Sequence, residues 1–154
     1  MLVIIGATED GRKEFIGIHD GVRESKQSWK DFLQNLKSRS LVIEPSLAVG
    51  DGALGFWAAI EEEYPRCRQQ RCWVHKTANI LDKMPKSVQP NAKRMIHEMY
   101  LSPTKETAFK AYEEFLAHYS AKYPGAAKCL EKDQRTDVQF LRFSCRALAT
   151  YTNN

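Results

Sequence analysis

The 154-residue sequence contains no run of about 18 consecutive apolar residues, which a membrane-spanning helix requires. Its first residues include neither a basic segment nor a small-residue cleavage site of the kind that directs secretion. Internal repeats and low-complexity linkers are also absent. Only four cysteines are present, and without an export signal we expect reduced thiols rather than a disulfide framework. These absences predict a cytoplasmic protein without membrane contact.

The composition that remains is that of an ordinary globular protein, with 43% hydrophobic and 27% charged residues. A chain of this length can bury one core but is short for two independent domains. Its charge is uneven, because residues 1–75 contain 10 Lys/Arg and 11 Asp/Glu, whereas residues 76–154 contain 13 and 8. The basic second half indicates either a polyanionic partner or a lysine-rich helical surface that faces water.

Residue patterns in the first half predict an α/β fold. Residues 2–8 and 14–18 are rich in β-branched residues, and the Asp10-Gly11 turn between them predicts an antiparallel hairpin. Since the first segment is apolar on both faces, we expect a central strand that is covered on both sides. Apolar spacing further predicts a helix from residue 25 to about 38, a short buried strand over 47–49, a helix over 53–63 and an extended piece over 70–74.

After His75 the pattern is helical throughout. Apolar residues recur at helical spacing in every segment, and Pro103 and Pro124 suit the first turns of helices. The predicted helices cover 77–84, 91–101, 104–121 and 125–132. The sequence therefore predicts a strand-rich α/β half followed by an all-helical half.

Asp51 is the strongest candidate for a catalytic group. It follows the predicted strand over 47–49, and α/β folds present catalytic groups at the carboxyl ends of strands. A carboxylate is a suitable ligand for Mg²⁺, because hard cations prefer oxygen. An Asp-Gly pair after a strand is also a common turn or helix cap, and two-metal chemistry needs several converging carboxylates. No other acid of the first half follows a strand in this way.

The spacing Cys72-x-x-His75, with Cys67 nearby, raises the question of a zinc site. A structural zinc site needs four ligands, usually as two pairs, and no second Cys/His pair lies at usable spacing. The other candidates are isolated on predicted helices: His97, His118, Cys129 and Cys145. We therefore interpret Cys72 and His75 as a local brace, whose thiol and imidazole bond neighbouring backbone beside the strand of Asp51.

A set of basic side chains at the start of the helical half forms the candidate DNA-binding surface. Positive side chains spaced along helices neutralise phosphate charge without reading the bases. The set comprises Lys76, Lys83, Lys86, Lys93 and Arg94.

Five segments recur together in one known family. They are Ile5-Gly-Ala-Thr-Glu-Asp-Gly-Arg-Lys-Glu14, Asp20-Gly-Val-Arg-Glu-Ser25 with Trp29, Val49-Gly-Asp-Gly-Ala-Leu-Gly-Phe56, Arg68-Gln-Gln-Arg-Cys-Trp-Val-His-Lys76 and Met84-Pro-Lys-Ser-Val-Gln-Pro90. In these segments the chain resembles bacterial insertion-sequence transposases of the Mutator type. The resemblance extends over residues 1 to about 133.

This resemblance implies a fold and a chemistry. It implies a partial ribonuclease-H-like mixed sheet with helices over residues 1–75 and a helical insertion region over 76–133. The family cuts and joins DNA with Mg²⁺ through an Asp-Asp-Glu set, in which Asp51 matches the second acid and would bind the metal. Cys72 and His75 match the Cys-x-x-His signature of the family.

The resemblance also implies that two catalytic acids are missing. The family's first Asp lies on a strand upstream of the segment matching Leu2–Gly6, and its Glu lies in a stretch reading approximately FYDFPAEHWQHIRTTNPIES. This chain ends instead on FLRFSCRALATYTNN, from Phe140 to Asn154. Suitable codons for that ending, read one base later, encode YDFPAEHWQHIRT. We therefore expect residues 134–154 to be an aberrant, frameshifted tail and Met1 to be an internal start.

Three functions stay open at this point. The resemblance predicts a fragment of a transposase that, in its intact form, binds insertion-element DNA and performs Mg²⁺-dependent strand cleavage and transfer. With two acids absent, the fragment would be inactive alone. The alternatives are a non-catalytic module that binds DNA or full-length transposase, and a decayed remnant without a present role. A missing strand would leave an open edge or gap in the sheet.

Overall fold

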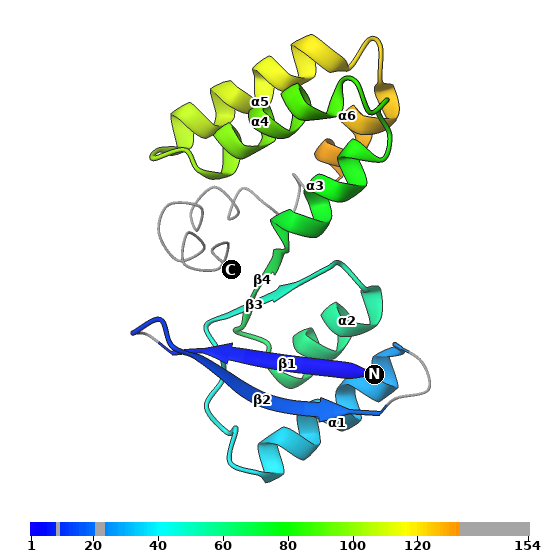
Figure 1. Cartoon of the computed structure of the whole chain (residues 1–154). Coiled ribbons are helices and arrows are strands. Elements are labelled where there is room, and N and C mark those ends of the chain that lie inside the picture. Colours follow the sequence, from blue (N-terminus) through cyan, green and yellow to red (C-terminus); the bar gives the residue numbers. More distant parts are fainter. Residues whose placement is uncertain (9, 21–23, 133–154) are drawn as a thin grey trace. The chain divides into compact units, whose positions relative to one another are not determined.

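The computed structural model describes residues 1–8, 10–20 and 24–132 (Figure 1). It confirms a mixed α/β protein, with four strands and six helices among the described residues. The backbone divides into two compact units, the first Met1–Arg71 and the second beginning at Cys72. The predicted frameshifted tail over 134–154 lies outside the described residues. In the part of the chain that is described, no helix is long and apolar enough to cross a membrane.

The first unit begins with the predicted hairpin. Strands β1 (Leu2–Ala7) and β2 (Lys13–His19) pair antiparallel, with a register shift between Ile4 and Ile5. Gly11 in the connection has φ +83°, a left-handed conformation that glycine adopts without strain. The Asp-Gly signal therefore identified the turn correctly.

Helix α1 (Lys26–Ser38) packs on one face of this hairpin (Figure 1). It begins as predicted at Ser25, whose hydroxyl accepts a 3.1 Å hydrogen bond from the Ser28 N–H and so satisfies one of the free donors of the first turn. Phe32 and Leu36 of the helix form a buried cluster with Leu2. The predicted apolar stripe is therefore largely buried, and its members Phe32 and Leu36 pack on the hairpin.

The prediction that the first strand is covered on both faces is wrong for the described residues. Leu2 is buried on the inner face, but Val3 is 40% and Ile5 is 64% exposed on the outer one. The apolar pattern is present on both faces, yet no element of the first unit packs on the outer face among the described residues.

Strands β3 (Leu47–Gly50) and β4 (Arg68–Arg71) form a parallel pair joined through helix α2 (Leu54–Glu63). These elements confirm the strand predicted over 47–49 and the helix predicted over 53–63, although Val49 is half-exposed rather than buried. A cluster beneath them joins α1 to α2 and to the residues just before β4; it comprises Leu33, Ala59, Ile60, Tyr64 and Cys67.

The described strands do not form the single mixed sheet that was predicted. They form two separate two-stranded sheets, β1–β2 and β3–β4. Since no described strand pairs with the second edge of β1 or of β3, nothing links the two sheets by hydrogen bonds. A ribonuclease-H-like sheet therefore remains a prediction.

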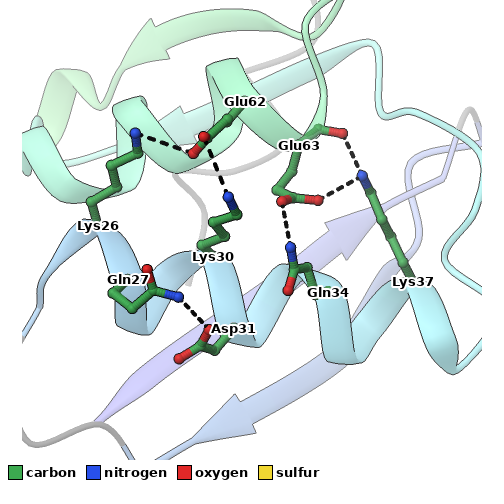
Figure 2. Close-up of polar contacts among 8 residues, drawn as sticks. All are labelled: Lys26, Gln27, Lys30, Asp31, Gln34, Lys37, Glu62 and Glu63. Atoms are coloured by element: carbon green, nitrogen blue, oxygen red, sulfur yellow. Dashed lines mark hydrogen bonds and ion pairs between the residues drawn. The ribbon is translucent and has the colours of Figure 1, made fainter.

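Helices α1 and α2 are also joined by a row of polar contacts (Figure 2). Lys26 and Lys30 lie 3.1 and 3.3 Å from the two carboxylate oxygens of Glu62. About two helical turns after Lys30 along α1, the Lys37 Nζ lies 2.8 Å from the carboxylate of Glu63. The same Nζ lies 4.5 Å from the ring centroid of Tyr64. These contacts fix α2 against α1, and with it the loop that carries Asp51.

The second unit consists of α3 (Trp73–Leu81), α4 (Gln89–Tyr100), α5 (Lys105–Tyr119) and α6 (Pro124–Glu131). All four predicted helices are present. The prediction of an extended piece over 70–74 is wrong after Arg71, because α3 begins at Trp73, four residues before its predicted start. Its buried side chains recur at helical spacing, and the shared core of the unit includes Trp73, Ile80, Ile96, Met99, Phe115 and Leu130.

Candidate functional site

Asp51 lies where the sequence placed it, directly after the last residue of β3 and exposed to solvent. Its carboxylate Oδ1 accepts a 3.0 Å hydrogen bond from the N–H of Ala53, the residue that caps α2. Ala53 itself provides no side-chain cap. Asp51 therefore has the structural role of a turn residue as well as the position expected of a catalytic acid, and the two roles are compatible because a carboxylate has further acceptor sites.

Arg71, at the end of β4, fixes the same turn. Its Nε donates a 3.2 Å hydrogen bond to the carbonyl oxygen of Asp51. Gly52 has φ +99°, and a Cβ added there would lie 2.4 Å from the Arg71 Nε. The backbone conformation thus favours glycine at position 52, and an added Cβ would also displace the guanidinium packed against it. No local sequence signal distinguishes Arg71, although it lies within the family segment that contains Cys72 and His75.

Gly55, the second residue of α2, allows a close approach of two backbones. A Cβ at this position would lie 2.8 Å from both the carbonyl oxygen of Glu24 and the amide nitrogen of Lys26. The start of α2 therefore packs directly on the start of α1. Together with Gly52, this glycine explains physically why the turn at Asp51 has the pattern Asp-Gly-Ala-Leu-Gly.

The donor set around Asp51 does not fit a complete Mg²⁺ site. Among the described residues there is no group of three or more His, Cys, Asp or Glu side chains that could hold a metal ion. A hard cation in a two-metal site needs several oxygen ligands, so one carboxylate is insufficient. The same finding gives no support to a zinc site at Cys67, Cys72 and His75. Burial raises the pKa of the Cys67 thiol to about 11, which opposes the thiolate that zinc requires.

Cys72 and His75 lie at the start of α3 rather than on an extended segment. Cys72 is the N-cap residue, and its side chain makes no capping hydrogen bond. His75 follows within the first turn and is exposed. The interpretation of Cys72 and His75 as a local brace therefore stays a prediction.

The candidate DNA-binding residues divide into two classes. Lys83, Lys86, Lys93 and Arg94 are exposed, as a surface that contacts phosphate requires. Lys76 is the exception, because its side chain is only 3% exposed and its Nζ lies 5.3 Å from the ring centroid of Trp73. It occupies the buried side of α3, and we remove it from the DNA-contacting set.

Lys93 and Arg94 line a shallow groove between α4 and α5. The groove also contains His97, Ser102 and Thr107, which the sequence reading did not associate with phosphate contact. Arg94 is paired with Glu98 one turn along α4 and donates a 2.9 Å hydrogen bond to Asn91. Burial, with a smaller contribution from the charge of Lys93, lowers the pKa of His97 and so favours its neutral imidazole. Lys93 and His97 are four residues apart on one helix, so the sequence alone could have placed them on the same helix face.

Comparison with known proteins gives a match along the whole chain. The sequence matches the family described as "Transposase, Mutator family" over residues 1–154. It is 50% identical over 143 residues to the transposase for insertion sequence element IST2 of Acidithiobacillus ferrooxidans. It is 43% identical, also over 143 residues, to the transposase for insertion sequence element IS6120 of Mycolicibacterium smegmatis. The family match thus extends past residue 133, at about which the resemblance was expected to end.

The alignments cover nearly all of this chain but less than half of each relative. Each alignment includes 93% of this chain, but only 48% of the Acidithiobacillus protein and 44% of the Mycolicibacterium protein. The chain thus spans about half the length of the curated relatives that it matches.

Proposed function

This chain belongs to the Mutator family of transposases, and from that premise we propose that Asp51 is one acid of a metal-binding catalytic set. The observation that supports this role is its place, exposed at the carboxyl end of β3 in a turn fixed by Arg71. In a complete transposase, further acids would converge with Asp51 on Mg²⁺ and allow cleavage and joining of insertion-element DNA.

We propose that the isolated chain neither cleaves nor joins DNA. One carboxylate can supply only part of the coordination shell of one metal ion, whereas phosphoryl transfer needs charge neutralised on both the attacking and the leaving oxygen. Among the described residues, Asp51 belongs to no group of three or more His, Cys, Asp or Glu side chains that could hold a metal ion.

A nicking assay tests this proposal. The full chain is incubated with insertion-element end DNA and Mg²⁺ or Mn²⁺, beside its Asp51→Asn variant. Asparagine keeps an oxygen that can accept the Ala53 N–H, so the turn should persist while the charge is lost. We expect no cleavage by either protein. Metal-dependent nicking by the chain that disappears in Asp51→Asn would refute the proposed inactivity and at the same time support the role of Asp51.

DNA is the proposed partner of the helical unit, through phosphate contacts made by Lys83, Lys86, Lys93 and Arg94. These four exposed bases lie within a half of the chain with 13 Lys/Arg against 8 Asp/Glu. Lysine and arginine release condensed counterions when they bind phosphates, so the affinity should fall steeply with salt.

Salt-dependent DNA binding by two matched variants tests this contact. Lys93→Gln/Arg94→Gln should reduce the slope of log K against log salt by about 2, which is about 1 for each lost phosphate contact. The control is Lys128→Gln/Lys132→Gln, which removes the same charge from exposed positions at the end of α6. Equal effects of the two double variants would show that only net charge matters, and would count against the groove.

Association with a transposase is the second candidate function. It is favoured by one observation in the first unit, the exposed apolar face of the hairpin.

A further inference from the structure

The outer face of the β1–β2 hairpin is an exposed apolar surface. The register pairs Val3 with Ile18 and Ile5 with Phe15, so these four side chains form two neighbouring cross-strand pairs on one face. Their exposed fractions are 40%, 54%, 64% and 65% in the order Val3, Ile18, Ile5 and Phe15. We call these four residues the hairpin outer face.

The inner face of the same hairpin shows what a covered surface looks like in this protein. Leu2 is 1% exposed there, and a Cβ added at Gly17 would lie 3.1 Å from a methyl carbon of Leu36 on α1. None of the three hydrophobic clusters of the described residues includes a member of the hairpin outer face. One face is therefore packed by α1, whereas the other presents four exposed apolar side chains and packs on no described element of the first unit.

An arrangement of this kind indicates a missing protein surface. Antiparallel strands with one face in water alternate apolar and polar residues, whereas strands covered on both faces are apolar throughout. Scattered exposed apolar residues are normal, but contiguous ones mark sites of protein contact. The hairpin outer face is contiguous, since each of its members lies beside another along a strand or across the pair.

We propose that the hairpin outer face binds transposase polypeptide from outside the part of the family that this chain matches. The two relatives that are 50% and 43% identical share only 48% and 44% of their length with this chain, so more than half of each polypeptide is available to cover the face. A full-length transposase would supply that segment to this chain as a partner. The proposal rests on family membership and on the second candidate function, and needs neither DNA binding nor catalysis.

Co-purification tests the proposal. The Acidithiobacillus ferrooxidans transposase is tagged and co-expressed with the full chain, so that both fold together, and the lysate is treated with nuclease to remove bridging DNA. We expect the chain to be retained, and Ile5→Thr/Phe15→Thr to reduce its recovery at least tenfold. Threonine keeps the strand preference of both positions, and circular dichroism checks that the variant is folded.

A matched control separates this surface from general stickiness. Val74→Thr/Phe109→Thr replaces two apolar residues that are 64% and 45% exposed in the helical unit, and it should leave recovery unchanged. Failure of the transposase to retain the chain, or equal recovery of the two double variants, would overturn the proposal.

Self-association is the competing outcome. The second bait is the 143-residue segment of the Acidithiobacillus protein that aligns with this chain, and it should retain none, because the proposed segment lies outside it. Light scattering should likewise show the chain alone to be monomeric. Retention by the short bait, or a dimer of the chain that Ile5→Thr/Phe15→Thr dissociates, would identify a second copy as the occupant and overturn the proposal. The interpretation of these co-purification results does not depend on the outcome of the nicking or DNA-binding assays.

Discussion

The Arg71 Nε donates a hydrogen bond to the carbonyl oxygen of Asp51, so the end of β4 fixes the turn that presents the candidate acid. The contact is possible because Gly52 has no side chain in the space that the guanidinium occupies. Three residues therefore act as one unit: Asp51 supplies the carboxylate, Gly52 the left-handed turn, and Arg71 the restraint.

Gly52→Ala should cost more stability than an alanine in a left-handed turn normally does. Any alanine at φ +99° is strained by about 1–2 kcal/mol, and here the new Cβ also displaces Arg71, which loses a hydrogen bond worth about 1 kcal/mol. Gly11→Ala is the matched control, because φ is +83° and no atom lies within 4 Å of the added Cβ. Urea unfolding should show the larger loss for Gly52→Ala. The difference should vanish when both variants are made in an Arg71→Ala background, and persistence of the difference there would contradict the role of Arg71.

Gly55→Ala should destabilise the first unit through a backbone clash. The added Cβ would lie 2.8 Å from main-chain atoms of Glu24 and Lys26. Because main-chain atoms cannot rotate away as a side chain can, α2 must move away from α1, which should cost about 1–3 kcal/mol. Gly125→Ala, in helix α6, is the control, because its nearest contact would be 3.9 Å away. Alanine there should be neutral or stabilise by up to about 1 kcal/mol. Thermal unfolding of the two variants measures both effects, and similar melting temperatures would disprove the close approach at Gly55.

Local signals in the sequence were sufficient for most of the elements. The Asp-Gly turn identified the hairpin, and Trp29, Phe32, Leu33 and Leu36 identified α1, because each signal depends only on residues close in the chain. The segment after Arg71 was misread as extended. Its helix is recognised by Trp73, Thr77 and Ile80, whose spacing becomes clear only when they are taken together as a buried stripe.

The candidate site was only partly visible in the sequence. Asp51 could be found because its signal, a strand followed by an acid, is local. The contact of Arg71 with Asp51 joins residues 20 positions apart and depends on the parallel pairing of β3 with β4, which no local pattern specifies. The burial of Lys76 was predictable in part, because it follows Trp73 by three residues and so lies on the same side of α3. The exposure of the hairpin outer face could not be predicted, because an apolar pattern does not show whether, or by which polypeptide, a face is covered.

Acid should weaken the contact between α1 and α2. The Lys37 ammonium, with help from the Gln34 amide, holds the pKa of Glu63 below its ordinary value of 4.5. Because the folded pKa is the lower one, the stabilisation is fully present above the unfolded value and is lost as the pH falls below 4.5 through the folded value. Glu63→Gln should therefore lower the unfolding free energy at pH 7, and the difference between the two proteins should shrink as the pH falls below 4.5. Glu61→Gln, which alters an exposed acid of the same helix, is the control, and an identical pH profile for it would contradict the assignment.

Cys67 should resist alkylation in the folded protein although it lies only five residues from Cys72. Its pKa of about 11 results first from burial and then from the negative charge of Glu44, whose carboxylate accepts a 2.9 Å hydrogen bond from the Cys67 N–H. At pH 8 only about 1 in 1,000 of such thiols is ionised, against about 1 in 10 at the ordinary value of 9.0. Limited reaction with iodoacetamide, followed by residue-resolved mass spectrometry, should therefore label the half-exposed Cys72 well before Cys67, and urea should remove the difference. Equal labelling of the two thiols in the native protein would show that the cluster around Cys67, which joins α1 to α2, does not protect this thiol from the reagent.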